Sequence, residues 1–271
     1  MGLTHHDRNT SAPNGVADDM HIVERGTGVP VVFLHGFSVD HRIMLPLDPA
    51  FAGGAWRRLY VDMPGFGHSP RGDVSSTDEL VEAVDSGLTD LLGGESFVLV
   101  GNSYGGMVSR IIAGRRPQQV IGLATIFGLV VPDLAARDVP AHVVRRSDPS
   151  AVALAGASDY TDLAVIQSPQ TAQGFLDYIQ PGLQAADPEA VEMLSAAYAP
   201  TIEPGRYAGP SLFVTGRQDS VVGYRDTMAS LENYPAATLA VLDGVGHNGH
   251  LEAPALVHAL LTDWLERVLA P

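Results

Sequence analysis

The sequence predicts an α/β protein in which a mostly parallel, doubly wound sheet carries an inserted helical segment. Three observations predict this fold. Short apolar runs of strand length alternate with longer segments of helical periodicity. One long, proline-rich stretch interrupts that alternation, and a glycine-rich turn from Gly101 to Gly106 joins an apolar run directly to a helix. Alternating strands and helices favour a parallel sheet with helices on both faces.

The first half of the chain supplies most of the expected sheet. Residues 1–19 are small and polar without periodicity, so we expect a flexible tail. The helix over 77–92 has Thr77 as its expected N-cap and Gly93 just past its end. In chain order the elements are strands over 21–25, 30–34 and 59–62, a helix over 77–92, a strand over 96–100, a helix over 104–115 and a strand over 120–127.

The alternation stops at Pro132. From there to residue 205 seven further prolines cut the chain into short amphipathic stretches, which predicts a helical cap over 132–205. Strand patterns return over 211–215 and 238–242, with helices over 224–231 and 253–269. The core is therefore expected over 20–131 and 206–271.

Composition excludes several classes of function. The formal charge of −15 argues against nucleic acid and anionic membranes as partners, because phosphate binding needs concentrated positive charge. All basic residues are arginine and there is no cysteine, so Schiff-base and thiolate chemistry are excluded within this chain. No apolar stretch approaches the roughly 20 residues that span a bilayer. We expect a cytoplasmic protein with a small-molecule substrate, and homo-oligomer formation stays open.

The glycine-rich turn has the Gly-x-Ser-x-Gly form of a nucleophile elbow around Ser103. A serine hydroxyl needs a base, normally a histidine that a carboxylate orients. The loops after the two later strands supply Asp219 and His247 in the chain order expected of such a triad. Asp243 is the rival acid, and motif position favours Asp219.

An oxyanion hole completes the expected site. It must offer backbone N–H groups to the developing charge on a carbonyl oxygen. Phe37 follows the buried strand over 30–34, and Tyr104 follows the serine, so we assign their N–H groups to this role.

Other polar residues near these motifs receive structural interpretations. We expect His35, Asp62 and His68 to hold loops, and His250 to cap a helix or line the pocket. The pair Arg145 and Arg146 could meet an anionic substrate, although exposed arginines are usually solvated surface.

Five ordered motifs resemble the α/β-hydrolase superfamily, in the branch with a serine nucleophile and a helical cap. They cover essentially residues 20–131 and 206–271. The motifs are His35-Gly36-Phe37, Asp62 to Ser69, Gly101 to Gly106, Gly216 to Asp219 and Gly246 to Glu252. The resemblance implies the α/β-hydrolase fold, with the insertion in the usual place of a cap domain.

The resemblance also narrows the chemistry. Haloalkane dehalogenases and epoxide hydrolases of this superfamily use an aspartate at the elbow, whereas this chain has Ser103. Carbon–carbon hydrolases of ring-fission products share a Gly-Asn-Ser elbow, but usually carry Gly-Pro-Gly where this chain has Phe37 to Asp40.

These patterns predict a hydrolase that acts on a small or medium apolar ester or lactone through an acyl-enzyme. No cofactor and no metal is expected. Three alternatives stay open on the same fold: a carbon–carbon hydrolase of a ketone, a biosynthetic cyclase, thioesterase or lyase, and a non-catalytic ligand receptor.

Overall fold

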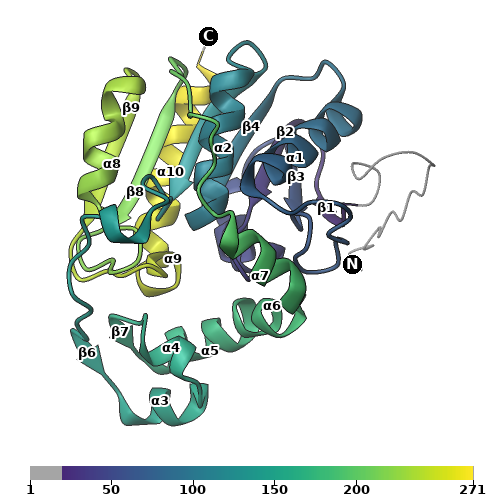
Figure 1. The fold of residues 1–271 in the computed structure, drawn as a ribbon. Coiled ribbons are helices and arrows are strands. Elements are labelled where there is room, and N and C mark those ends of the chain that lie inside the picture. Colours follow the sequence, from purple (N-terminus) through teal and green to yellow (C-terminus); the bar gives the residue numbers. More distant parts are fainter. Residues whose placement is uncertain (1–19, 271) are drawn as a thin grey trace, which may run out of the picture.

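Seven strands form one twisted sheet in the computed structural model, which describes residues 20–270 (Figure 1). The strand order is β1-β3-β2-β4-β5-β8-β9, and every neighbouring pair is parallel except β1 with β3. The expected α/β class with a mostly parallel sheet is confirmed. The strands are β1 (Ile22–Arg25), β2 (Val29–Leu34), β3 (Trp56–Val61), β4 (Phe97–Asn102), β5 (Val120–Ile126), β8 (Ser211–Gly216) and β9 (Ala237–Leu242).

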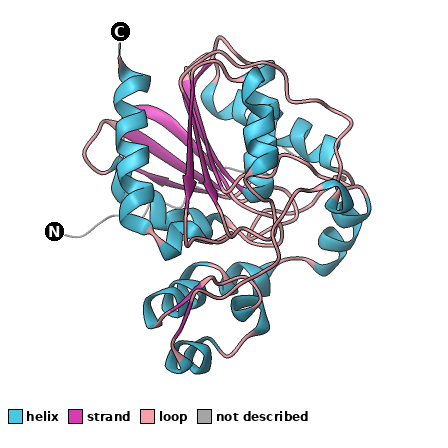
Figure 2. Ribbon diagram, turned by 90° about the vertical axis from the view of Figure 1, so that its left-hand side faces the viewer, coloured by secondary structure: helices cyan, strands magenta, loops and turns pink. Residues whose placement is uncertain are grey.

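Helices cover both faces of the sheet because its central strands are apolar on both sides (Figure 2). In β2, Val31 and Phe33 face one core cluster, and Val32 and Leu34 face the other. The first cluster includes α10 (Pro254–Leu269) and the 3₁₀ segment η2 (His41–Phe51). The second includes α1 (Thr77–Leu92) and α2 (Ser103–Arg115).

A smaller helical unit lies beyond the carboxyl ends of the strands, between β5 and β8 in the chain (Figure 1). Its last helix, α7 (Pro188–Ala196), runs into a segment that lies against α1, where the Thr77 N–H donates to Ala197 O at 3.1 Å. In order the elements of the unit are η3 (Leu134–Ala136), β6 (Arg146–Ser147), α3 (Pro149–Ala155), α4 (Ser158–Thr161), β7 (Ile166–Gln167), α5 (Pro169–Tyr178), α6 (Gln180–Ala185) and α7 (Pro188–Ala196).

Local details differ from the sequence expectations at several points. The two-residue strands β6 and β7 pair inside the helical unit, where no apolar run marks a strand. The segment η2 was not expected, because Pro46 and Pro49 break its helical pattern. Ser76, and not Thr77, caps α1 by accepting from the Glu79 N–H, while Thr77 is buried and hydrogen-bonds Tyr104.

The strand order places the loops that carry the polar motifs at the usual ligand-binding position of such sheets. The order reverses between β2 and β4, and ligands of open α/β sheets bind at the carboxyl ends of strands at such a switch point. Leu34 is paired with Gly101 across these strands, so the loop after β2 lies beside Ser103. The remaining short elements are α8 (Arg225–Ser230), η4 (Leu231–Asn233) and α9 (Gly249–Glu252). Within residues 20–270, helices with the length and hydropathy of a membrane span are absent.

Candidate active site

Ser103 is the first residue of α2 and lies on a tight turn after β4. Its φ of 50° is in the left-handed region, which a serine adopts only where the surrounding fold enforces it. The glycines two residues before and after Ser103 are needed because neighbouring atoms leave no room for a Cβ at either position. A Cβ on Gly105 would lie 2.2 Å from Leu34 O, and one on Gly101 would lie 2.5 Å from the Ser109 hydroxyl. The turn is therefore packed tightly against β2 and holds the serine in place.

Three polar side chains from three strand-end loops meet at this turn. His247 Nε2 lies 3.0 Å from Ser103 Oγ, and His247 Nδ1 lies 3.0 Å from Asp219 Oδ2. Asp219 is fully buried, and its other oxygen accepts from the N–H groups of Val221 and Val222 at 2.9 and 3.0 Å. The carboxylate is therefore fixed from two sides, and it favours the tautomer of His247 that leaves Nε2 to accept a proton from Ser103.

Asp243, the rival acid in the sequence, lies away from His247. Its side chain is 73% exposed, and it accepts from Gln218 Nε2 at 3.0 Å. Gln218 also accepts from the Val245 N–H at 3.0 Å, so it joins the loop of the acid to the loop of the histidine. Of the two carboxylates, Asp219 is the one that the fold brings to the imidazole.

The two residues expected to donate to an oxyanion both lie close to Ser103, one on the loop after β2 and one directly after the serine in the chain. Phe37 lines the same cavity as Ser103, and Tyr104 is its neighbour in the first turn of α2, where N–H groups have no intrahelical partner. Among residues 20–270, neither N–H has a protein hydrogen-bond acceptor. The ring of Phe37 packs at 5.3 Å on Tyr104 and at 5.1 Å on Tyr198. These contacts fix the loop after β2 close to the elbow.

A cavity of about 240 Å³ lies over the serine, between the core and the helical unit. Of the described residues that line it, none is an arginine, and Asp159 is the single carboxylate. Most of its wall is apolar, which suits an uncharged ligand. The lining residues are Gly36, Phe37, Val39, Ile43, Asn102, Ser103, Asp159, Leu163, Ile179, Leu183, Tyr198, Val221, His247 and Asn248.

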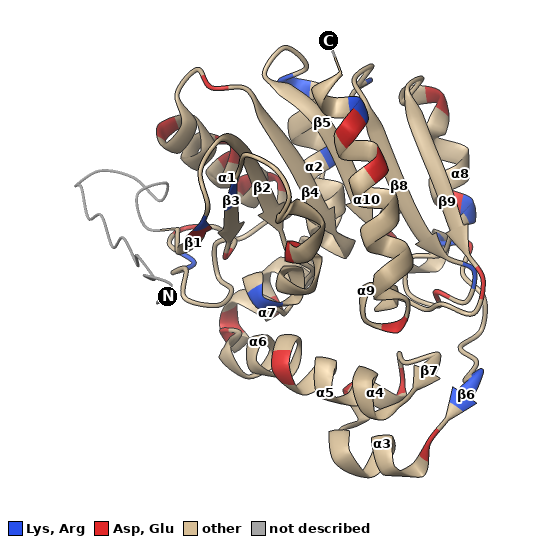
Figure 3. Cartoon of the chain, turned by 180° about the vertical axis from the view of Figure 1, so that it is seen from behind, with Lys and Arg blue, Asp and Glu red and all other residues tan. Residues whose placement is uncertain are grey.

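The two cap arginines of the sequence analysis do not line this cavity. Arg145 and Arg146 are exposed, and Figure 3 shows the basic residues of this segment at β6, toward the far end of the helical unit. They are part of the solvated surface of that unit.

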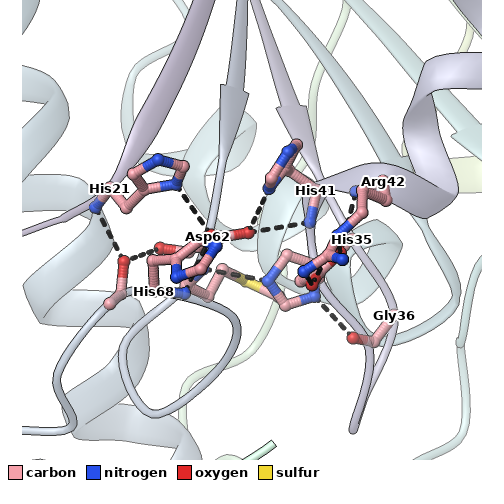
Figure 4. A network of polar contacts seen from close by, with 10 residues as sticks. His21, His35, Gly36, His41, Arg42, Asp62 and His68 are labelled. Carbon is pink, nitrogen blue, oxygen red and sulfur yellow. Dashed lines mark hydrogen bonds and ion pairs between the residues drawn. The ribbon is translucent and has the colours of Figure 1, made fainter. Parts of the chain in front are cut away.

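The buried carboxylate of Asp62 and its hydrogen bonds hold the segment that follows β2 (Figure 4). Asp62 Oδ1 accepts from the backbone N–H and the ring Nδ1 of His41, both at 2.8 Å. Asp62 Oδ2 accepts from His21 Nδ1 at 2.8 Å and from the His68 N–H at 3.0 Å. Burial alone would raise the pKa of Asp62, but the hydrogen bonds from His21 and His41 outweigh it and hold the pKa well below its usual range.

This network contains a set of potential metal ligands. Among the described residues, His21, His41 and Asp62 bring one donor atom each within 4.8 Å of one another. Four N–H groups already occupy the lone pairs of the carboxylate, so hydrogen bonds account for its burial without a cation. His35 is a second loop anchor, since its Nε2 accepts from the Met63 N–H at 2.9 Å. These residues hold the loop, as their sequence context indicates.

His250 is buried beside a different depression. It lines an open groove of about 500 Å³ between α5 and α9, and not the cavity over Ser103. Within the described chain, neither of its ring nitrogens has a hydrogen-bond partner. Burial, with a smaller contribution from the charge of His247, lowers the pKa of His250 to about 3. The ring is therefore neutral and does not cap α9.

Glu252 is a buried polar contact of the histidine loop that we did not single out from the sequence. It appeared there only as the last residue of the motif that begins at Gly246. Its carboxylate accepts from the Gly246 N–H at 2.6 Å, next to His247. Burial outweighs its three hydrogen bonds and raises the pKa of Glu252. A glutamate five residues after a candidate catalytic histidine was the only signal available for its role.

The sheet order, with its helices on both faces, is that of an α/β hydrolase. Comparison with known proteins gives the same class. The family model described as alpha/beta hydrolase fold matches residues 29–254, and the chain belongs to this family. The chain is also similar to an alpha/beta superfamily hydrolase from Oenococcus oeni PSU-1, with a TM-score of 0.85 and 25% identity over 93% of this chain and 97% of that one.

The curated relatives that this chain resembles have more than one activity. The chain is 36% identical over 111 residues to pimeloyl-[acyl-carrier protein] methyl ester esterase from Shewanella woodyi, covering 41% of this chain and only 40% of that protein. It is 32% identical over 257 residues to 2-succinyl-6-hydroxy-2,4-cyclohexadiene-1-carboxylate synthase from Escherichia coli O157:H7, covering 88% of this chain and 94% of that enzyme.

Proposed function

We propose that this protein is a serine hydrolase that acts on a small, uncharged ester or lactone. The observation that carries the proposal is the contact of Ser103, His247 and Asp219, with 3.0 Å at each hydrogen bond, beneath an apolar cavity. The similarity to an esterase over part of the chain supports the same reaction class.

In the proposed reaction, Ser103 Oγ attacks the carbonyl carbon while His247 Nε2 takes the hydroxyl proton. The N–H groups of Phe37 and Tyr104 donate to the oxyanion that forms. His247 then returns the proton to the leaving alcohol as its bond to the acyl carbon breaks. Water, activated by the same imidazole, attacks the acyl-enzyme, and Ser103 regains its proton. Asp219 orients His247 and stabilises its cation throughout.

Size and charge of the cavity limit the proposed substrate. A volume of about 240 Å³ is below the usual range for drug-sized ligands. At the volume that one water occupies in the liquid, it holds on the order of ten non-hydrogen atoms. Since the described lining contains Asp159 and no arginine, an anionic substrate would be desolvated there without a counter-charge. These facts support a short, neutral ester.

A second candidate is a lyase or synthase reaction, which the similarity to the E. coli synthase over nearly the whole chain favours. The product in that enzyme's name carries two carboxylates. The absence of arginine from the described cavity lining argues against such a substrate here. The hydrolase proposal therefore takes precedence.

Intact-mass analysis after exposure to a small fluorophosphonate tests the proposal, with Ser103→Ala as the control. We expect one adduct per wild-type chain and none on the variant, followed by hydrolysis of short p-nitrophenyl esters but not of the monoester of a dicarboxylic acid. A folded wild-type protein that neither labels nor hydrolyses any of these esters would contradict the proposal.

A further inference from the structure

One carboxylate connects the helical cap to the loop of the candidate catalytic histidine. Glu252 Oε1 accepts from the backbone N–H groups of Val165 and Ile166, at 2.7 and 3.2 Å. Glu252 Oε2 accepts from the N–H of Gly246 at 2.6 Å. The first two donors lie 87 and 86 residues before Glu252 in the chain and belong to the cap at β7.

The same two segments also touch directly, with no space for a side chain between them. A Cβ on Gly246 would lie 2.6 Å from the Val165 Cγ2 atom and 3.2 Å from Leu163 O. Val165 is fully buried, and Leu163 lines the cavity over Ser103. The cap wall of the cavity and the histidine loop therefore meet here, and Glu252 spans this contact.

We propose that Glu252 is a positioning residue that couples closure of the cap to the alignment of His247 with Ser103. This inference rests on the proposed function. With the cap in place, two N–H groups fix Oε1, and the carboxylate in turn holds Gly246 and the imidazole of the next residue. When the cap moves away, Oε1 loses both donors, and the histidine loop loses one of its anchors. Ser103 is then fully activated only beneath a closed cap.

A purely structural role of Glu252 and the proposed coupling role predict different reactivities of Ser103 in the folded variant. A carboxylate that only stabilises the fold affects the melting temperature but leaves the reactivity of Ser103 unchanged in the folded protein. The coupling role predicts slower reaction of Ser103 in a protein that is still folded, because a misaligned imidazole accepts the serine proton less well.

The variant Glu252→Gln tests the coupling, because it keeps the size of the side chain and leaves one oxygen to accept where two did. The matched control is Glu266→Gln, an exposed glutamate on α10. At a temperature well below melting, we expect Glu252→Gln to lower the second-order rate of fluorophosphonate labelling by about ten- to a hundredfold, the range for a hydrogen bond to a charged group. Glu266→Gln should label at the wild-type rate. A folded Glu252→Gln protein that labels at the wild-type rate would overturn the proposal.

Hydrogen exchange supplies a readout that needs no activity. In Glu252→Gln we expect faster amide exchange in residues 163–167 of the cap and, together with them, in residues 244–249 of the histidine loop. Faster exchange in only one of the two segments would overturn the coupling. If the wild type itself fails to label at Ser103, the proposed function fails, while the exchange result still decides whether the cap and the loop are coupled.

A rescue experiment keeps the proposal testable if Glu252→Gln does not fold. Gly246→Ala forces a Cβ against Val165, so we expect it to displace the cap and slow labelling. Adding Val165→Ala removes the severe conflict with the Cγ2 atom, while the 3.2 Å approach to Leu163 O persists, so it should restore part of the rate. A double variant no faster than Gly246→Ala alone would show that the contact does not transmit cap position to His247.

Discussion

The substitution Asp219→Asn isolates the contribution of a single oxygen atom to the candidate site. Asp219 is fully buried and accepts from three N–H groups, two on Val221 and Val222 and one on His247. An asparagine has one acceptor oxygen, and the two backbone donors hold it. Its NH₂ group then faces Nδ1 of His247 and donates to it.

This change reverses the tautomer of the imidazole. Nε2, 3.0 Å from Ser103 Oγ, now carries the proton and can no longer accept one from the serine. We expect kcat to fall by about 10⁴, which corresponds to about 5 kcal/mol in the activation barrier. The backbone contacts of residue 219 persist, so the loss of stability should be only about 1–2 kcal/mol.

Initial rates of p-nitrophenyl acetate hydrolysis near neutral pH, together with a thermal melt, measure both quantities. Asp243→Asn is the matched control, since Asp243 is exposed and lies away from His247. It should keep the wild-type rate. The reasoning fails if Asp219→Asn retains more than about a tenth of the rate, or if Asp243→Asn loses as much.

Three further predictions concern the supports and the size of the site. Asp62→Asn leaves two of the four donors to this buried carboxylate without an acceptor and should lower the free energy of unfolding by about 3 kcal/mol at neutral pH, measured by urea titration. Because the folded pKa of Asp62 is depressed, its contribution is complete above the unfolded value of about 4 and is lost as pH falls below it, so wild type and variant should converge in acid. Gly105→Ala places a Cβ 2.2 Å from a backbone oxygen and should cost at least about 3 kcal/mol in a calorimetric melt, whereas Gly94→Ala, with open space around it, should be nearly neutral. Leu183→Ala enlarges the cavity and should shift the preferred p-nitrophenyl ester to a longer acyl chain, and an unchanged chain-length profile would contradict the proposed pocket.

The fold was predictable because its signals are local. Each central strand is an apolar run, and helices such as α1 and α7 carry capping residues next to their first turn. The pairing of β6 with β7 was not predictable, because two residue pairs leave no periodic pattern. The one-residue error at the α1 cap arose because Ser76 and Thr77 are both good caps, and burial of Thr77 against Tyr104 decides between them.

Some residues of the candidate site could likewise be predicted from the sequence, and others could not. Ser103, Asp219 and His247 lie at the ends of recognisable strands, so motif order was enough to nominate them. Glu252 acts across 87 residues of chain on backbone N–H groups, which have no sequence signature at all. The size and charge of the cavity depend on cap residues such as Asp159, whose side-chain positions follow only from the tertiary fold.

The insertion of the cap between β5 and β8 also sets an order in time. Ser103 is separated from His247 by 144 residues, with the entire cap and β8 between them. During synthesis Ser103 and α2 are made first, whereas His247, the proposed base, is made only after the helical unit. If the proposed function holds, a nascent chain has no base for Ser103 until the helical unit that covers the cavity has been made. Under the same proposal, synthesis that stalls anywhere before β9 yields no active hydrolase.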